Sequence, residues 1–445
     1  MVFAFSEKYD SPARPDDSRA HPDLAVVIPA WNERENIELL LPALKEMIAD
    51  LGLTAEIVVA DGGSRDGTAE AAQRRGARVV VQNEPGYGSA LLAGFAATAA
   101  PYIVTMDADL SHRPVFLQEF WQRRHEAEVL IASRYVPGGR ADMSRFRRLL
   151  SHILNFSYSR VLSFPLRDLS SGFRMYHRDV LMGLTLVARD FDMLEEILIR
   201  VHAEGWRILE IPFHYMSRGS GSSHVRLFKF GWAFAKTLVR MWRLRNSVAA
   251  ADYDHRAFNS PIWLQRYWQR TRHRIVLGYV ESPKSVLDIG CGSSRIIQDL
   301  SDAVGLDVLQ HKLRWLKQRH RLLVRASCDR LPFRANSFDT VINSEVIEHV
   351  HDSPEIWSEM WRVLRPGGVL VLGTPDYGRW LWWVLEWIYG KVLVGAYAHE
   401  HITHFNREEV ARRLRADGYE ILDCQYVGFC EMIFKAKKPI TNQKT

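Results

Sequence analysis

Two aspartates one residue apart follow a short apolar run in the first half of the chain. The stretch TMDADLSHRP covers residues 105–114, with Asp107 and Asp109 directly after the apolar residues YIVTM. On a straight strand such side chains point to opposite faces, but where the strand ends both can converge on one cation. Carboxylate oxygens suit Mg²⁺ or Mn²⁺, and a cation held there neutralises charge on a leaving diphosphate. The pattern predicts a metal and diphosphate site, with a solvated turn as the alternative.

A glycine-rich turn in the second half predicts a different ligand. The segment VLDIGCGSS, residues 286–294, contains Gly290 and Gly292, which allow a ligand to approach the backbone closely. Asp307 ends the next apolar run, VGLD, where a carboxylate can bind the two hydroxyls of a ribose. The combination indicates a cofactor that contains a nucleoside.

Both groups of residues require strands that end at one edge of a sheet. In the first half we expect strands at 25–30, 55–61, 78–82 and 102–107, with helices at 32–51 and 89–99. In the second half we expect strands at 285–290, 303–307, 338–344 and 368–375. Alternating strands and helices predict parallel sheets with helices on both faces, which bind ligands at the carboxyl ends of their strands. The predicted fold class is therefore α/β, with two Rossmann-like domains.

Composition and length agree with two folded domains. We expect an N-terminal tail over 1–20, a first domain over 21–247, a helical linker over 248–282, a second domain over 283–438 and a tail over 439–445. Four scattered cysteines and a polar N-terminus without a signal peptide favour the reducing cytoplasm. The apolar stretch 380–397 is interrupted by Glu386 and Lys391, so it is a poor membrane span. We expect no nucleic-acid partner, and the sequence does not indicate the oligomeric state.

Five motifs in a fixed order carry a family resemblance in the first domain. They are IPAWNE, VADGGSRDGT, MDADLSH, SRYVPGG and DLSSGFRMY. Over residues 24–245 the chain resembles inverting GT-A glycosyltransferases of the dolichyl-phosphate mannosyltransferase type. This resemblance implies transfer of a sugar from a nucleotide sugar to a polyprenyl phosphate, in which the phosphate itself is the nucleophile and no strong base is required.

The resemblance also implies a role for individual residues. The nucleoside would be bordered by Pro29, Trp31, Glu33 and Asp61, and the metal and donor diphosphate would be held by Asp107 and Asp109. Ala108 would also contact the nucleotide sugar, and Arg218 would contact the donor diphosphate. The acceptor phosphate would be bound by Arg134, Arg147 and Ser151. For Arg147, in RFRRLL, an exposed basic helix face is the alternative interpretation.

A lipid acceptor requires contact with a membrane surface. The segment 225–243, VRLFKFGWAFAKTLVRMWR, places Arg226, Lys229, Lys236, Arg240 and Arg243 on one arc of a helix and aromatic residues on the remainder. Such a helix is suited to an anionic membrane interface. The alternative is that its aromatic side packs against its own domain.

The second domain carries a second resemblance. The series VLDIGCGSS, VGLD, CDRLPFRANSFDTVINSEVIEHV and WRVLRPGGVLVLGTP resembles class I S-adenosylmethionine-dependent methyltransferases over residues 283–438. The resemblance implies that the cofactor is bound by Asp288, Gly290, Gly292, Asp307, Asp329, Arg330, Asn343 and Ser344.

The segment SEVIEHV predicts the catalytic part of this second site. Glu345, Glu348 and His349 are spaced to lie on one face of a helix, and the trio resembles a motif of ubiquinone O-methyltransferases that can bind a divalent ion. We predict that His349 is catalytic, as a general base, with simple helix packing as the alternative. We further expect His401 and His404 to line the acceptor pocket and the Trp-rich stretch 380–397 to cover it, with membrane contact as the alternative.

These expectations combine into one functional hypothesis. The chain is predicted to be a cytoplasmic enzyme, peripherally bound to the membrane, that glycosylates polyprenyl phosphate and methylates an oxygen on a related sugar or lipid intermediate. One alternative is a glycosyltransferase acting on a non-lipid glycan. Another is a membrane scaffold with one non-catalytic domain.

Overall fold

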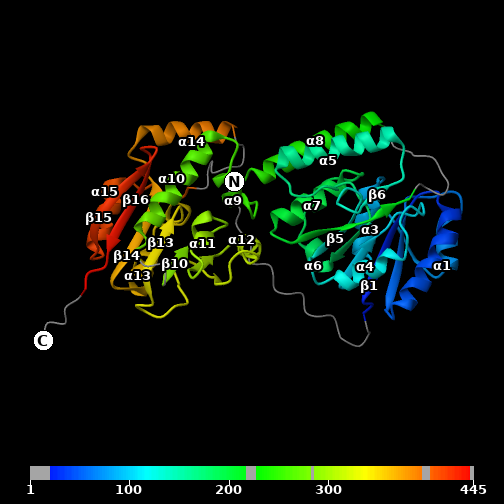
Figure 1. Cartoon of the computed structure of the whole chain (residues 1–445), viewed down its shortest axis with the longest axis horizontal. Helices are drawn as coiled ribbons and strands as arrows, with labels where there is room; N and C mark the ends of the chain where they lie inside the picture. The colour runs from blue at the N-terminus through cyan, green and yellow to red at the C-terminus, as the bar shows by residue number, and fades with distance from the viewer. Residues whose placement is uncertain (1–20, 217–226, 282–284, 393–400, 441–445) are drawn as a thin grey trace. The chain divides into compact units, whose positions relative to one another are not determined.

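The chain divides into two compact α/β units. The structure, a computed structural model, describes residues 21–216, 227–281, 285–392 and 401–440 (Figure 1). The first unit comprises the described parts of Met1–Ser157, Pro165–Glu195 and Ile208–Ala233. The second comprises the described parts of Tyr158–Phe164, Glu196–Arg207 and Phe234–Thr445.

The first unit is built on a seven-stranded sheet with the strand order β3-β2-β1-β4-β7-β5-β8. Its strands are β1 (Leu24–Ala30), β2 (Ala55–Asp61), β3 (Arg78–Val81), β4 (Tyr102–Thr105), β5 (Val129–Ser133), β7 (Arg174–His177) and β8 (Ile208–Pro212). The predicted strands correspond to β1 to β4, which pair in parallel. The expectation of a parallel sheet is wrong for β7, which is antiparallel to β4 and β5. An apolar run reads the same in both directions, so it carries no information on strand direction.

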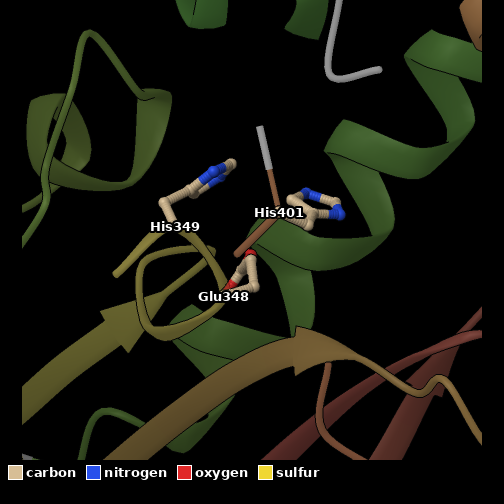
Figure 2. Close-up of side chains that lie close together, drawn as sticks. All are labelled: Glu348, His349 and His401. Carbon is tan, nitrogen blue, oxygen red and sulfur yellow. The ribbon is translucent and has the colours of Figure 1, made fainter. Parts of the chain in front are cut away.

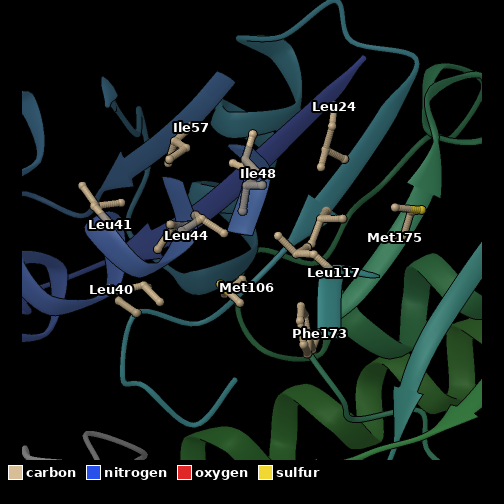
Figure 3. Close-up of a cluster of buried hydrophobic side chains, with 14 of the residues drawn as sticks. Leu24, Leu40, Leu41, Leu44, Ile48, Ile57, Met106, Leu117, Phe173 and Met175 are labelled. Carbon is tan, nitrogen blue, oxygen red and sulfur yellow. The ribbon is translucent and has the colours of Figure 1, made fainter. Parts of the chain in front are cut away.

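Helices surround this sheet and supply its core. They are α1 (Arg34–Asp50), α2 (Thr68–Arg74), α3 (Tyr87–Ala96), α4 (Phe116–Arg123), α5 (Arg145–Leu162), α6 (Arg178–Met182) and α7 (Met193–Ala203), and the end of α5 and most of α7 belong to the second unit. Strands β6 (Arg140–Ala141) and β9 (His214–Tyr215) form a small separate sheet. Leu40, Leu41, Leu44 and Ile48 recur at helical spacing in α1 and pack in the buried cluster of Figure 3. Truncating one of these leucines to alanine costs about 2–5 kcal/mol.

The second unit contains another seven-stranded sheet, in the order β12-β11-β10-β13-β14-β16-β15. Its strands are β10 (Val286–Ile289), β11 (Val304–Asp307), β12 (Leu323–Arg325), β13 (Phe338–Ser344), β14 (Leu364–Pro375), β15 (Glu420–Val427) and β16 (Glu431–Lys437). Strands β10 to β14 pair in parallel, but β16 is antiparallel to β14 and β15. A tight turn with positive φ at Gly428 and Phe429 joins β15 to β16, and such a hairpin requires antiparallel strands.

The helices of the second unit include the predicted linker. They are α8 (Leu227–Arg245), which begins before this unit, α9 (Tyr253–Phe258), α10 (Trp263–Tyr279), α11 (Arg295–Asp299), α12 (Gln310–Leu316), the 3₁₀ turn η1 (Ile347–His349), α13 (Pro354–Val363), α14 (Trp380–Val392) and α15 (Arg407–Ala416). The segment 248–282, predicted to be a helical linker, contains the helices α9 and α10 and belongs to this unit as far as it is described. None of the helices that the structure describes is both long and apolar enough to cross a bilayer.

Each sheet reverses the direction of its strand order next to its first strand. In the first unit β1 lies between β2 and β4, and in the second unit β10 lies between β11 and β13. The crevice at the carboxyl ends of strands at such a switch point is where open α/β sheets bind ligands. Asp107 and Asp109 follow β4, and the turn with Gly290 and Gly292 follows β10, so both sets of predicted residues lie at a switch point.

Candidate active sites

The Asp107 carboxylate is fixed by two aromatic side chains that the sequence analysis did not assign. The Tyr87 hydroxyl, at the start of α3, donates to Oδ1 of Asp107 at 2.9 Å. His112 accepts a hydrogen bond from the Asp107 backbone N–H at 3.0 Å, and its Nε2 lies 3.8 Å from Oδ2. Burial raises the pKa of Tyr87 well above its ordinary value, and the charge of Asp107 adds to this, so the phenol remains a donor. His112 belongs to the motif DADLSH and could have been predicted to lie near Asp107. Tyr87 belongs to no motif near Asp107 in the sequence.

Asp109 and a neighbouring glycine complete this site. Asp109 is buried and accepts hydrogen bonds from the hydroxyl and the backbone N–H of Ser111. A Cβ on Gly172 would lie 2.7 Å from the Tyr87 hydroxyl and 3.3 Å from Oδ1 of Asp107. Glycine therefore keeps space beside the carboxylate, and two hard carboxylate ligands next to that space fit Mg²⁺ or Mn²⁺. Ala108, between the two aspartates, is buried.

The predicted nucleoside residues lie on two adjacent strands. Ala30 of β1 pairs with Asp61 of β2, so Trp31 and Asp61 occupy neighbouring strand ends. Asp61 is buried and accepts hydrogen bonds from Ser64 and from the Gly63 N–H at 3.0 Å, which shapes the loop after β2. Trp31 is 47% exposed, so its indole is accessible to a ligand. Pro29 and Glu33 flank it and are half-buried.

The predicted acceptor residues are connected through a buried salt bridge. The Arg134 guanidinium donates to both carboxylate oxygens of Asp168, at 2.8 and 2.6 Å, and to the Ser170 hydroxyl at 2.7 Å. The hydroxyl oxygens of Ser170 and Ser151 are 3.3 Å apart, and the Tyr135 hydroxyl donates to Ser151 at 2.8 Å. The structure thus brings Arg134 and Ser151 into one network. Asp168, the first residue of the motif DLSSGFRMY, is the salt-bridge partner of Arg134 and had no role assigned from the sequence.

Two other predicted residues are not part of this network. Arg147 is exposed on the first turns of α5, and its binding of the acceptor phosphate stays a prediction. Arg218, predicted to contact the donor diphosphate, lies outside the residues that the structure describes.

The predicted membrane helix uses part of its apolar side for packing. In α8, Phe234 and Met241 are buried, and Arg240 donates to Glu196 at 2.9 Å. The expected cationic arc is therefore wrong at Arg240, because this side chain neutralises a buried carboxylate. Trp232 of α8 is 76% exposed, whereas Arg226 and the Lys229 side chain lie outside the described part of the chain.

Helix α5 exposes apolar side chains that the sequence analysis did not single out. Phe146, Leu149, Ile153 and Phe156 follow helical spacing and are 54–71% exposed. The same helix begins with arginines at 145, 147 and 148, all exposed. This combination of apolar stripe and positive charge is typical of a surface that lies on an anionic membrane.

The cofactor residues of the second unit include buried polar atoms that lack protein partners. Among the residues that the structure describes, none hydrogen-bonds to Oδ2 of Asp288, to the Asn343 amide or to the Ser344 hydroxyl. Asp288 and Asn343 are buried. Burial raises the pKa of Asp288 to about 8, and the charge of Asp307 adds to the shift. Buried polar groups without partners are costly, so these atoms fit a polar ligand such as S-adenosylmethionine.

The glycine turn has the backbone that a close ligand requires. Gly290 and Gly292 have φ of +67° and +52°, and a Cβ on Gly290 would lie 2.2 Å from Val346. Asp307 accepts hydrogen bonds from the Gly292 and Leu309 N–H groups, both at 2.8 Å. The turn and the carboxylate predicted to bind ribose are therefore in direct contact.

Asp329 and Arg330, predicted to flank the adenine, follow β12. Both are exposed. Strand β12 pairs with β11, with Arg325 opposite Asp307, so this loop begins at the strand end beside the predicted ribose ligand.

The segment SEVIEHV does not form the expected helix. Glu345 has φ of +62°, and only residues Ile347–His349 form a 3₁₀ turn. The prediction that Glu345, Glu348 and His349 share one helical face is therefore wrong, because the positive φ of Glu345 breaks the helical geometry. Glu345 instead lies 3.1 Å from Arg272 of α10.

Glu348 and His349 are grouped with His401, as Figure 2 shows. Their ligand atoms lie within 4.8 Å of one another, and within the described ranges they are the one group of three side chains that could hold a metal ion. Two imidazoles and a carboxylate are ligands that transition metals such as Zn²⁺ accept. Burial raises the pKa of Glu348 to about 7, against the opposing effect of His401.

His401 and His404 lie beside a tyrosine that orients them. The Tyr377 hydroxyl and Nδ1 of His401 are 2.6 Å apart, and Glu386 lies 3.4 Å from the same nitrogen. The hydrogen bond with His401 holds the pKa of Glu386 below its usual value. His404 stacks on the Tyr377 ring with centroids 4.0 Å apart.

The Trp-rich stretch 380–397 is helical as far as Val392. Its remaining residues, 393–397, lie outside the described part of the chain. Trp382 lines a pocket with His401, whereas Trp380 and Trp387 are 75% and 61% exposed. The stretch therefore lines a pocket with Trp382 and exposes its three other tryptophans, of which Trp383 is 51% exposed.

Comparisons with known proteins agree with two transferase domains. Residues 25–185 match the model of glycosyl transferase family 2, and residues 287–372 match a model described as methyltransferase domain. A dolichol-phosphate mannosyltransferase from Pyrococcus furiosus is 32% identical over 46% of this chain, and the match spans 59% of that protein. A dolichyl-phosphate hexose transferase from Haloferax volcanii is 31% identical over 49% of this chain and 93% of that protein.

Solved structures resemble each half at low similarity. Glucosyl-3-phosphoglycerate synthase from Mycobacterium tuberculosis, with Mn²⁺ and UDP, is 20% identical with a TM-score of 0.40, covering 50% of this chain and 80% of that one. A SAM-dependent methyltransferase from Thermotoga maritima is 19% identical with a TM-score of 0.36, covering 41% of this chain and 94% of that one. These scores are too low to bear on function.

The folds and the matched segments define an enzyme with a GT-A glycosyltransferase domain and a class I methyltransferase domain. The chain belongs to glycosyl transferase family 2, and its second half carries the methyltransferase domain.

Proposed function

We propose that the first domain transfers a sugar from a GDP or UDP sugar to a polyprenyl phosphate, with inversion at the anomeric carbon and with Mg²⁺ or Mn²⁺. The observation that carries this proposal is the pair Asp107 and Asp109 at the end of β4, beside the space that Gly172 leaves. The names of the relatives, which contain dolichol phosphate and dolichyl phosphate, support a lipid phosphate acceptor.

In this mechanism the protein mainly orients the reactants. A bound divalent cation would neutralise charge on the departing diphosphate. Tyr87 holds the Asp107 carboxylate and His112 accepts a hydrogen bond from the Asp107 backbone N–H, so the geometry of Asp107 is set before the donor arrives. We retain Arg134, Arg147 and Ser151 as the proposed acceptor-phosphate site, where Arg134 would act from within its salt bridge to Asp168. An oxygen of the acceptor phosphate then attacks the anomeric carbon as the bond to the diphosphate breaks.

Exposed residues of α5 support peripheral binding to a membrane. The apolar stripe from Phe146 to Phe156 would enter the interface, and the three arginines at the start of α5 would contact anionic lipid headgroups. This placement would keep the first domain on the cytoplasmic surface that carries the lipid phosphate.

We propose that the second domain methylates an oxygen of a sugar or lipid intermediate with S-adenosylmethionine. The unpartnered polar atoms of Asp288, Asn343 and Ser344 support the cofactor, with Asp307 for the ribose and Asp329 and Arg330 for the adenine. His349 is retained as the proposed general base for the acceptor hydroxyl. A metal ion at Glu348, His349 and His401 is the second candidate role, supported by their mutual proximity.

Partition of labelled products tests the first proposal. The full chain is incubated with labelled GDP-mannose or UDP-glucose and Mg²⁺ or Mn²⁺, with and without polyprenyl phosphate. We expect label in the organic phase only with the lipid, and none for Asp107→Asn. Label that enters a water-soluble glycan regardless of the lipid would favour the non-lipid alternative. Offering the product of each domain to the other tests whether both serve one pathway, and no mutual processing would refute that link.

A further inference from the structure

A pocket in the second unit lies between the linker helix α10 and the Trp-rich helix α14. It is lined by aromatic, amide and charged side chains, among them Gln265, Trp268, Gln269, Arg272, Glu345 and Trp382. Only Glu345 of these lies within residues 287–372, the segment that matches the methyltransferase model. Helices α10 and α14, which lie outside that segment, give the pocket most of its lining.

Trp268 offers a rigid aromatic face to this pocket. Its indole N–H donates to the buried carboxylate of Glu431, which also accepts two hydrogen bonds from Arg272, at 2.6 and 2.8 Å. A Cβ on Gly428 would lie 2.5 Å from the Trp268 ring, so only glycine allows the backbone to support the indole there. The hydrogen bond to Glu431 and the packing against Gly428 therefore fix the orientation of the Trp268 side chain before any ligand binds.

Trp382 lies next to Trp268, and polar side chains also line the pocket. The Trp268 and Trp382 ring centroids are 6.1 Å apart with planes inclined by 49°, and Trp382 stacks on His401 at 6.0 Å. Gln265 and Gln269 lie four residues apart on α10, and the Gln265 amide donates to the Tyr253 hydroxyl at 3.3 Å. The pocket therefore combines flat apolar surfaces with hydrogen-bonding groups.

Residues that line or adjoin the pocket also contact the predicted cofactor turn. Asp254, next to Tyr253 in α9, accepts hydrogen bonds from the Ser293 N–H at 3.1 Å and from Lys312 at 3.0 Å. Glu345 directly follows Asn343 and Ser344, whose polar atoms lack partners in the described structure. A molecule in the pocket would thus lie beside the cofactor site, which is the arrangement that transfer between two bound molecules requires.

We propose that this pocket is the methyl-acceptor site and that it binds a sugar ring. The proposal rests on the methyltransferase function proposed above and names its substrate class. A pyranose has apolar C–H faces, which indole surfaces bury favourably, and hydroxyl edges, which glutamine amides and carboxylates bind. A prenyl chain in the same place would cover Oε1 of Glu345, which accepts no hydrogen bond within the described residues, with hydrocarbon, and this costs free energy without compensation.

Binding of simple glycosides to the full chain tests the proposal. The probes are methyl α-D-mannopyranoside and methyl β-D-glucopyranoside, measured by saturation-transfer difference NMR with S-adenosylmethionine present. We expect at least one glycoside to bind, with affinity at least tenfold weaker in Trp268→Ala, Trp382→Ala and Gln265→Leu. Trp263→Ala is the matched control, because Trp263 is 68% exposed on the same helix and does not line the pocket.

Measured binding of S-adenosylmethionine distinguishes a misfolded variant, a wrong sugar site and a wrong methyltransferase function. Unchanged calorimetric binding of S-adenosylmethionine in every variant shows that the unit is folded. Glycoside binding that none of the three pocket substitutions weakens would overturn the sugar site, and so would binding of farnesyl phosphate to the same tryptophans with no glycoside response. Absence of cofactor binding in the unmodified chain would contradict the proposed methyltransferase function instead.

Discussion

The protonation of Asp288 predicts how the binding of S-adenosylmethionine depends on pH. Burial raises the pKa of this carboxyl to about 8, with a further contribution from the charge of Asp307. The proposed role of Asp288 beside a cationic cofactor requires the ionised carboxylate, because only this form attracts positive charge. Below pH 8 the carboxyl must therefore lose a proton when the cofactor binds.

The size of the expected change in the dissociation constant follows from the raised pKa of Asp288. Below a pKa of about 8 the ionised fraction falls tenfold per pH unit, so the dissociation constant should rise about 100-fold from pH 9 to pH 6. Isothermal titration calorimetry in two buffers with different ionisation enthalpies measures both the affinity and the protons released. We expect release of nearly one proton at pH 6.5 and nearly none at pH 9.

The matched variant is Asp288→Asn, which cannot ionise. Its affinity should be weaker at pH 9 and should change little with pH. A dissociation constant for the unmodified chain that stays within about threefold from pH 6 to pH 9, without proton release, would refute the reasoning, since tenfold per unit is expected.

The pH dependence of folding stability provides an independent test of the raised pKa of Asp288. The pKa of Asp288 in the folded protein lies above its ordinary value of 3.8. The unligated unit should therefore be unaffected by this group below pH 4 and should lose stability as the pH rises towards 8. Asp288→Asn should remove that loss.

Three further substitutions test other parts of the two sites. Gly290→Ala should weaken S-adenosylmethionine binding at least tenfold, since its Cβ would lie 2.2 Å from Val346, whereas Gly278→Ala, with open space around it, should not; equal affinities would contradict the role of the turn. Tyr87→Phe should lower metal-dependent sugar transfer about tenfold by releasing the Asp107 carboxylate, with little change in stability, and an unchanged rate would show that this contact is dispensable. Arg134→Met should destabilise the first unit by about 3 kcal/mol, because it leaves the buried Asp168 carboxylate without its charged partner; an unaltered midpoint of chemical denaturation would refute this.

Much of the fold could be predicted because the apolar runs are strong and regularly spaced. Strands such as β1 and β10 lie at the predicted positions, and each ends at residues predicted to bind a ligand. The direction of β7 and β16 could not be predicted, because an apolar pattern has no polarity and β16 is reversed by its hairpin with β15.

Contacts between distant segments explain most of what the sequence analysis missed at the sites. Tyr87 reaches Asp107 across 20 residues, and Asp168 reaches Arg134 across 34, so no local pattern announces either pair. The helix expected at SEVIEHV fails for a local reason, the positive φ at Glu345, which is rare for a residue with a side chain. His401, which lies outside this motif, is the third member of the group with Glu348 and His349.

The central claim is that one chain carries two separate transferase sites, and one paired assay tests it most directly. Sugar transfer to polyprenyl phosphate and calorimetric binding of S-adenosylmethionine are measured on the unmodified chain and on Asp107→Asn and Asp288→Asn. We predict that Asp107→Asn abolishes transfer and retains cofactor affinity, and that Asp288→Asn weakens cofactor binding and retains transfer. Transfer that persists in Asp107→Asn, or cofactor affinity at pH 9 that is unaltered in Asp288→Asn, would contradict the account.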